Sequence, residues 1–556
     1  GVKPWRAAAA SPGWCKVKGE PTRLVSRTPL PTADVGARAT TSFILRAEKA
    51  QTMSLSKTTD YDSLEATTRI EDITGDEVNQ GTLRSLKDDD GELFSLSLCA
   101  EGVVEEGDYH PKSSEELGWL GHFAKKSAHL VELEVVGSTS DIFKNCSEQS
   151  EDRFYEDLCS CNNIKKIKVI DTDLADIISK LGTSVNKNFT RWDIQECYLG
   201  AVEVNQLFTA FQGIENLEEV SMSYEYDSRY RDVGDEIMAR CIQKLAACTR
   251  MQELNICGLR LHTNSCAALS TVFPRMAALL EMDLNDNLIG NDGVEVLIRG
   301  LAECKHLHSL SLCHNRIGDD GLEMLARGVP ASVNTLELRG NEIALFARQL
   351  PLLRFKKLDL SGNTLSSDGP RVIAASLANP ECRLEALYLG NTSIRDEGAE
   401  ILATSLRNNQ RLTELLLTSG NAITETTGWN VFLPILCDAT SIEATHGSNH
   451  TLQSLGYRYM VRQDIQTMLD LNSDKNKSSV AATKILQTHP HLDMRPLLDG
   501  RLILMPYVVA WLDRFAECRL DLKLSSIYEF ARAMPMEVVE GLSGTKKGKK
   551  RRRSSA

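Results

Sequence analysis

The sequence predicts an α/β fold: a solenoid with one parallel sheet on its concave side, helices on its convex side and a helical cap at its C-terminal end. Two observations lead to this prediction. A segment of about 28 residues recurs, most clearly as LEMDLNDNLIGNDGVEVLIRG (280–300) and HSLSLCHNRIGDDGLEMLARG (308–328). In each copy, apolar residues first alternate as in a strand and then follow the spacing of an amphipathic helix.

The recurring unit has the template L-x-x-L-x-L-x-x-N-x-I, followed by a glycine and a helix. Its second leucine position is occupied twelve times, by Leu96, Leu133, Ile167, Trp192, Val220, Leu254, Met282, Leu310, Leu336, Leu358, Leu387 and Leu415. We expect a weaker thirteenth copy at Ile442. One copy cannot bury its apolar face alone, so the copies must stack, and strands that all run in one direction form a parallel sheet.

The template resembles the leucine-rich repeat, in the long-repeat subclass typified by ribonuclease inhibitor. The resemblance covers about 90–450 and is clearest in 251–425, whereas the copies in 93–222 are degenerate. It implies a horseshoe that binds protein on its concave face without catalysis. Residues 449–455, 471–486 and 528–536 also resemble the C-terminal extension of a group of uncharacterised algal leucine-rich repeat proteins, which implies no activity.

The asparagine of the template follows the strand, where the chain turns toward the helix. Turning leaves buried backbone groups unpaired, at a cost of about 1–3 kcal/mol each, and an amide can both donate to and accept from them. We therefore expect a structural role, which the family resemblance identifies as an asparagine ladder, for Asn287, Asn315, Asn341, Asn363 and Asn421. The same position is occupied differently in four copies, by Thr172, Cys197, Leu259 and Thr392.

Residues between the template leucines should point onto the concave face. The candidates for contact with a partner are Glu253, Glu281, Asp283, Asn285, Ser311, His314, Glu337, Arg339, Asp359 and Tyr388. This middle region is acidic, and the early strands add a small basic island of Lys166, Lys168 and Arg191. The acidity indicates either simple solvation or the docking of a basic segment, with Tyr388 and Arg339 as anchors because Tyr and Arg are enriched at binding hot spots.

Five segments are expected along the chain. Residues 1–52, which are basic and lack periodicity, are interpreted as a disordered leader or a gene-model extension, with an organelle transit segment as the alternative. Residues 53–92 form a lead-in cap, 93–447 the solenoid of 12 to 13 copies, 448–543 a helical cap and 544–556 a disordered basic tail. Helices in the C-terminal cap are expected at 464–471, 479–487, 501–517 and 524–533.

The tail concentrates positive charge in Lys546, Lys547, Lys549, Lys550, Arg551, Arg552 and Arg553. Such a run cannot fold, because like charges repel. It is typical of a nuclear-import signal, a contact with nucleic acid or anionic lipid, or a merely solvated tail, and it could also lie on the chain's own acidic face. Phosphorylation of Ser554 or Ser555 would lower its charge.

Composition narrows the class of function. The chain has a net charge of −13, and because both ends are basic the body between them carries about −26, which disfavours the body as a nucleic-acid surface. No apolar run is long enough to span a membrane or to form a signal-peptide core, so the cysteines are expected to be reduced thiols. We find no nucleotide-binding, zinc-protease or nucleophile-elbow motif and expect no cofactor, no metal and no catalytic residue.

These observations predict a non-enzymatic scaffold, nuclear or cytoplasmic and monomeric, that binds a protein or peptide partner on its concave face. Two alternatives remain. One is a regulator of a small GTPase, because GTPase-activating proteins of Ran also use this repeat. The other is binding of nucleic acid or an anionic surface through the tail.

Overall fold

The computed structural model describes residues 59–100, 107–181, 189–224, 233–346 and 352–489. The chain forms two compact units, Gly1–Ala66 and Thr67–Ala556. In the first unit a short helix, α2 (Tyr61–Leu64), begins after Asp60, whose carboxylate accepts the Ser63 amide. The expectations for 1–52, the tail, and the helices at 501–517 and 524–533 lie outside the described residues.

The second unit is built on one parallel sheet in which nearly every strand lies next to its neighbour in sequence. The order is β13-β12-β11-β10-β9-β8-β7-β6-β5-β4-β3-β1-β2. The strands are β1 (Ser95–Cys99), β2 (Asp108–Tyr109), β3 (Glu132–Val136), β4 (Lys166–Ile170), β5 (Arg191–Gln195), β6 (Glu219–Ser223), β7 (Glu253–Ile256), β8 (Glu281–Asp283), β9 (Ser309–Ser311), β10 (Thr335–Glu337), β11 (Lys357–Asp359), β12 (Ala386–Tyr388) and β13 (Glu414–Leu416).

The register of the sheet matches the repeat. The twelve template positions pair with one another in an unbroken row from Leu96 to Leu415, and each is almost fully buried. The residues on either side of this row are the more exposed ones, as alternation requires. The predicted α/β solenoid with a parallel sheet is therefore confirmed. The thirteenth strand is the two-residue β2, which the template did not find.

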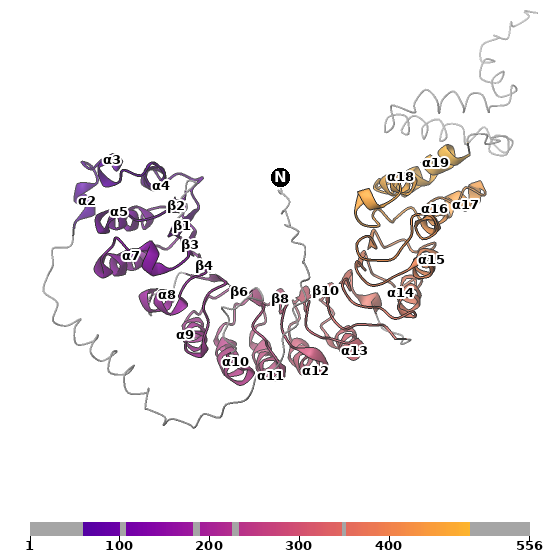
Figure 1. The fold of residues 1–556 in the computed structure, drawn as a ribbon, viewed down its shortest axis with the longest axis horizontal. Coiled ribbons are helices and arrows are strands. Elements are labelled where there is room, and N and C mark those ends of the chain that lie inside the picture. The colour runs from indigo at the N-terminus through magenta and orange to yellow at the C-terminus, as the bar shows by residue number, and fades with distance from the viewer. Residues whose placement is uncertain (1–58, 101–106, 182–188, 225–232, 347–351, 490–556) are drawn as a thin grey trace, which may run out of the picture. The chain divides into compact units, whose positions relative to one another are not determined.

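Helices lie on the other side of the sheet, and the strands line the inner side of this unit (Figure 1). The helices are α3 (Ile70–Ile73), α4 (Glu77–Lys87), α5 (Ser114–Ala124), α6 (Thr139–Ile142), α7 (Glu148–Ser160), α8 (Leu174–Leu181), α9 (Ala201–Gln212), α10 (Asp235–Ile242), α11 (Thr263–Val272), α12 (Gly290–Leu301), α13 (Asp319–Gly328), α14 (Gly369–Leu377), α15 (Asp396–Ser405), α16 (Leu433–Leu436), α17 (Ile442–His446), α18 (Gln463–Leu471) and α19 (Lys477–Thr488). In α12 the residues Val294, Leu297 and Leu301 are buried, which is the helical spacing that the template shows.

A second row of polar contacts joins the helix N-termini of neighbouring coils. Asp235 accepts the amides of His262, Asn264 and Ser265 at 2.8–3.1 Å, and so pairs the free amides at the start of α11. Asn291, Asp319 and Asp396 make equivalent contacts with the coil that follows each of them. The Asn or Asp two residues after the final apolar position of the template therefore caps the next coil.

The C-terminal end corrects one expectation. Ile442 does not open a thirteenth strand: it begins α17 and is 43% exposed. The coil after β13 instead passes through Ser454, which forms a parallel bridge with Glu414, so that the buried Leu455 continues the leucine row. The sequence of this coil, SNHTLQSL, keeps two of the template leucines but loses its asparagine, which is why the template passed over it.

Helices α18 and α19 then cover the end of the last coil. Asn449 donates to the carbonyls of Leu406 and Asn409, and the fully buried Lys484 donates through Nζ to Leu436 O at 2.6 Å and Asn449 O at 3.0 Å. Burial lowers the pKa of Lys484 to about 7. Carbonyls that would otherwise end the stack are thus paired by side chains from the cap.

The N-terminal end of the sheet holds a buried carboxylate. Glu116 of α5 is 1% exposed, and it accepts hydrogen bonds from Asn79 Nδ2 at 2.7 Å, from the Tyr109 hydroxyl at 3.0 Å and from the Lys112 amide at 3.2 Å. These contacts join α4, β2 and α5, so the lead-in is packed onto the first coil. Among the described residues, no helix is both long and apolar enough to cross a membrane.

Candidate partner-binding face

The exposed positions of the strands form two rows across the inner side of the sheet. The first row contains, from β6 to β8, Glu219, Glu253 and Glu281, and the second contains Asn255 and Asp283. Neighbouring strands are about 4.8 Å apart, so residues in one row are direct neighbours. We call this side of the sheet the strand face.

Cations on the strand face are paired with acids on adjacent strands. The three closest pairs are Lys166 with Glu132 at 3.4 Å, Lys168 with Glu134 at 2.7 Å and Lys357 with Glu337 at 2.8 Å. Arg191 Nε lies 3.8 Å from Glu219. The early basic island expected from the sequence is therefore largely neutralised, because the acids come from template positions on neighbouring coils.

Acids on β7 and β8 differ from this pattern. Glu253, Glu281 and Asp283, which we call the acidic strip, form no ion pair with any described residue. The negative charge of the strip acts on its neighbours: burial and, second, the charge of Glu253 raise the pKa of Glu219. Burial also raises the pKa of Asp283, whose carboxylate accepts the Asn285 amide at 2.9 Å.

Tyr388 on β12 lies within a cluster of charged residues. The Lys357 ammonium sits 5.2 Å from the centre of its ring, and its hydroxyl donates to Glu414 at 3.0 Å. Burial and the hydrogen bond to Glu414 raise the pKa of Tyr388 to about 12, so the hydroxyl keeps its proton. The ring is held from both sides, with Asp359 as its partner in the second row of the adjacent strand.

Four further candidates lie where β8 to β10 end. Ser311 is only 7% exposed, and its hydroxyl donates to Asn285 Oδ1 at 2.8 Å, so Ser311 is not an open contact position as the sequence analysis expected. His314 and Arg339 are exposed. The His314 ring lies where a side chain on residue 340 would stand, and this position is a glycine with φ +68°. The His314 ring can therefore occupy this position only because residue 340 has no side chain.

Four of the five template asparagines are buried beneath the strand face, and Asn421 is half-buried. Asn341 Oδ1 accepts the amides of Asn315 and Ile317 at 2.9 and 3.0 Å, and its nitrogen donates to Leu312 O and Leu338 O at 2.9 and 3.0 Å. Equivalent bonds between coils are made by Asn287, Asn315, Asn363 and Asn421. Four copies have another residue at the asparagine position, and in three of them it donates to backbone carbonyls. Thr172 and Cys197 each donate to a carbonyl of their own coil and to one of the preceding coil. Thr392 donates to Leu389 O of its own coil.

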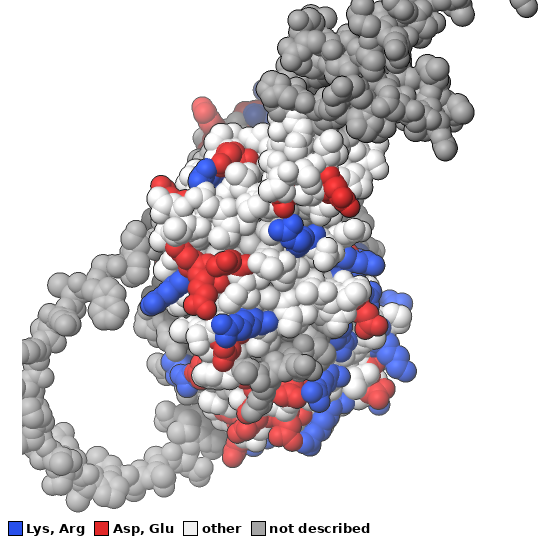
Figure 2. Space-filling view, turned by 90° about the vertical axis from the view of Figure 1, so that its right-hand side faces the viewer, with Lys and Arg blue, Asp and Glu red and all other residues white. Residues whose placement is uncertain are grey.

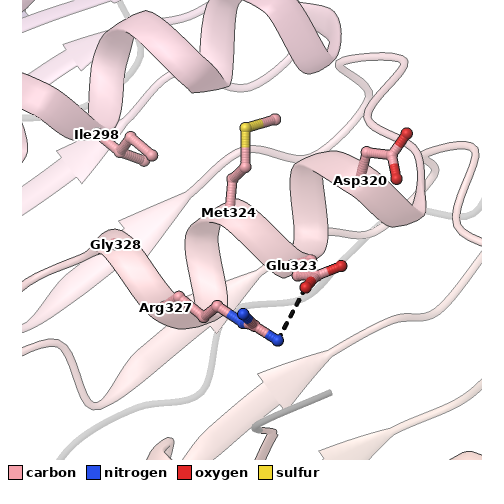
Figure 3. Close-up of a pocket in the computed structure, with 6 residues that line it drawn as sticks. All are labelled: Ile298, Asp320, Glu323, Met324, Arg327 and Gly328. Atoms are coloured by element: carbon pink, nitrogen blue, oxygen red, sulfur yellow. Dashed lines mark ion pairs between the residues drawn. The ribbon is translucent and has the colours of Figure 1, made fainter. Parts of the chain in front are cut away.

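The outer side of the sheet, which the helices cover, has fewer features that could bind a partner. The side of the molecule in Figure 2 carries blue and red side chains close together, with broad uncharged areas between them. Between α12 and α13 lies a shallow depression of about 460 Å³, lined by Ile298, Asp320, Glu323, Met324, Arg327 and Gly328 (Figure 3). Its charges include the Glu323–Arg327 pair at 2.9 Å. No sequence motif marks this depression.

Comparison with known proteins yields one family and a set of structures. A leucine-rich repeat family model matches residues 303–326. No curated protein matches significantly. An internalin from Listeria monocytogenes is 17% identical, covering 65% of this chain and 94% of its own, with a TM-score of 0.36. A Toll-like receptor 13 complex with single-stranded RNA is 15% identical, covering 62% and 46%, with a TM-score of 0.34.

The family model matches one repeat unit, and the strand register shows where the same unit recurs. Residues 303–326 include β9 and most of α13, and the leucine row carries the same unit through the sheet on both sides. The chain therefore contains a leucine-rich repeat at 303–326, and its sheet has the fold of a leucine-rich repeat solenoid.

Proposed function

We propose that this protein is a non-enzymatic scaffold that binds a protein or peptide partner on its strand face. The observation that supports the proposal is the acidic strip, three acids that form no ion pair with a described residue on a face where Lys166, Lys168 and Lys357 are each paired with an acid. A partner segment with Lys or Arg would supply the missing charges. Electrostatic complementarity of this kind governs specificity and association rate.

Tyr388 gives the proposed face an anchor. A tyrosine whose ring and hydroxyl are already held loses little conformational freedom when it is covered, and Tyr is enriched at hot spots. Asp359 is the register partner of Tyr388, and Glu337 is the register partner of Asp359 on the next strand. Together with the exposed Arg339 they would form the polar rim of the contact. The strip and this cluster are separated by four strand spacings, about 19 Å, which an extended segment of six or seven residues would span.

The test is quantitative capture of partners from the source cell. We expect a variant with Glu253→Gln, Glu281→Gln and Asp283→Asn to lose its main partner. A matched variant, Glu303→Gln with Glu381→Gln and Glu400→Gln, removes three exposed acids outside the strand face and should keep that partner. Equal capture by both variants would contradict the proposal.

We also propose a role for the template asparagines, a subclass for the repeat and the boundaries of the segments. We infer that the five template asparagines act as a ladder between coils, since each bonds to backbone groups of a neighbouring coil. The length of the repeat and the α-helix in most coils favour the ribonuclease-inhibitor-like subclass. The algal resemblance and the boundaries of the lead-in and cap are proposed on the sequence evidence.

For location, we propose the nucleus or the cytoplasm, with residues 546–553 as an import signal. A fluorescent fusion of the full chain should then enter the nucleus, and truncation after residue 543 should leave it in the cytoplasm. Equal nuclear signal from both fusions would remove the import role of the tail.

A further inference from the structure

The strand face already holds two of the chain's own lysines beside carboxylates of adjacent strands. Lys357 sits between a carboxylate and an aromatic ring, with Nζ 2.8 Å from Glu337 and 5.2 Å from the centre of the Tyr388 ring. Lys168 is held by Glu134, and this pairing raises the pKa of the lysine against the effect of burial. A half-buried carboxylate on this sheet therefore holds an ammonium group from the adjacent strand.

The acidic strip offers carboxylates at equivalent positions, and no cation of the described residues is paired with them. Glu253 and Glu281 are register partners on β7 and β8, and Asp283 lies two residues further along β8. Three acids within about 7 Å of one another repel, and a cationic segment laid across β7 and β8 would remove this repulsion. The face is thus complementary to an extended basic segment.

The chain itself contains such a segment. Residues 546–553 carry seven Lys or Arg and no acid. The described part ends at His489, which is 57 residues before Lys546. The helices expected at 501–517 and 524–533 leave about 30 of these residues outside a helix, and 30 residues can span up to about 100 Å when extended. The five strand spacings from β13 to β8 amount to about 24 Å along the sheet.

We propose that residues 546–553 dock on the acidic strip and compete there with the partner. This inference rests on the proposed function, because it assigns the tail to the same face. Tethering raises the local concentration of the tail to the millimolar range, so a weak contact suffices to occupy the strip. Phosphorylation of Ser554 and Ser555 would add negative charge beside the docked segment and release it.

The test uses a fluorescent peptide of residues 544–556 and measures its binding by anisotropy at low salt. The peptide should bind a chain that ends at residue 543 at least ten times more tightly than the full chain, whose strip is already occupied by its own tail. In the chain ending at 543, the Glu253→Gln, Glu281→Gln, Asp283→Asn variant should weaken binding at least tenfold. The variant at Glu303, Glu381 and Glu400 should stay within twofold.

Two results would overturn the inference. One is equal affinity of the peptide for the full and the shortened chain. The other is equal loss of affinity in both triple variants, which would indicate attraction to net charge alone. Neither result touches the proposed function, which is tested separately by repeating the partner capture with the two triple variants in a chain that ends at residue 543. A tail that fails to bind while the partner still requires the strip would refute only the docking of the tail.

Discussion

Replacement of Asn341 by Ala should destabilise the protein more than replacement of Asn315, although the repeat gives both the same position. Loss of the Asn341 amide leaves three backbone groups without their bonds: the amides of Asn315 and Ile317 and the carbonyl of Leu312. Its fourth partner, Leu338 O, still accepts from Asn363. At about 1 kcal/mol for each unpaired buried group, the free energy of unfolding should fall by about 3 kcal/mol.

The two carbonyls to which the Asn315 side chain donates each accept a second hydrogen bond from another residue. Leu284 O also accepts from Asn287 Nδ2, and Cys313 O also accepts the Asp286 amide. Only the amide of Ile289 loses its bond, which is long at 3.3 Å. The expected loss for Asn315→Ala is therefore about 1 kcal/mol.

Urea unfolding followed by far-ultraviolet circular dichroism measures both values. Asn408→Ala, a change at an exposed asparagine outside the template position, is the control and should shift the free energy of unfolding by less than about 0.5 kcal/mol. If Asn315→Ala costs as much as Asn341→Ala, the counting of unpaired groups fails. If both are neutral, the ladder itself is refuted.

Three further predictions concern packing, titration and the proposed anchor. A Cβ at Gly300 would meet the backbone of Ser270, whereas one at Gly328 would meet only a flexible isoleucine side chain; Gly300→Ala should therefore cost about 2 kcal/mol, and Gly328→Ala should be close to neutral in the same urea assay. Burial lowers the pKa of Lys484 to about 7, compared with 10.5 in the unfolded chain. Between these two pH values the unfolded chain binds one more proton than the folded chain, so the free energy of unfolding falls as the pH is lowered toward 7. The stability difference between wild type and Lys484→Met should thus change by up to about 1.4 kcal/mol between pH 7 and 8 in favour of wild type, and a constant difference would contradict the assigned burial. Tyr388→Ala should weaken partner binding at least tenfold in a titration, while Tyr388→Phe, which keeps the ring over Lys357, should weaken it less than threefold.

The repeat could be predicted from the sequence because each coil is a local pattern that recurs. The position of each template leucine fixes its strand and its face, and the register of the sheet follows because identical coils stack without offset. Helices α18 and α19 could be predicted in the same way, from apolar spacing between expected turns. The strand β2 could not, because a two-residue strand has no period.

Contacts between coils were harder to predict. That Asp235, Asn291, Asp319 and Asp396 cap the following coil depends on the distance between successive helices, which no single copy reveals. The neutralised basic island and the burial of Ser311 have the same cause, since both arise from side chains of adjacent strands. The acids of the acidic strip could be read from the sequence, but the register was needed to see that no described cation pairs with them.

Site-specific photo-crosslinking tests the central claim, that the strand face binds the partner, most directly. A benzoylphenylalanine introduced in place of Tyr388 or Glu253 in the source cell should crosslink the captured partner. The same group in place of Glu303, which is exposed next to α12, should not. Crosslinking of that partner from Glu303 but from neither position on the strand face would contradict the account.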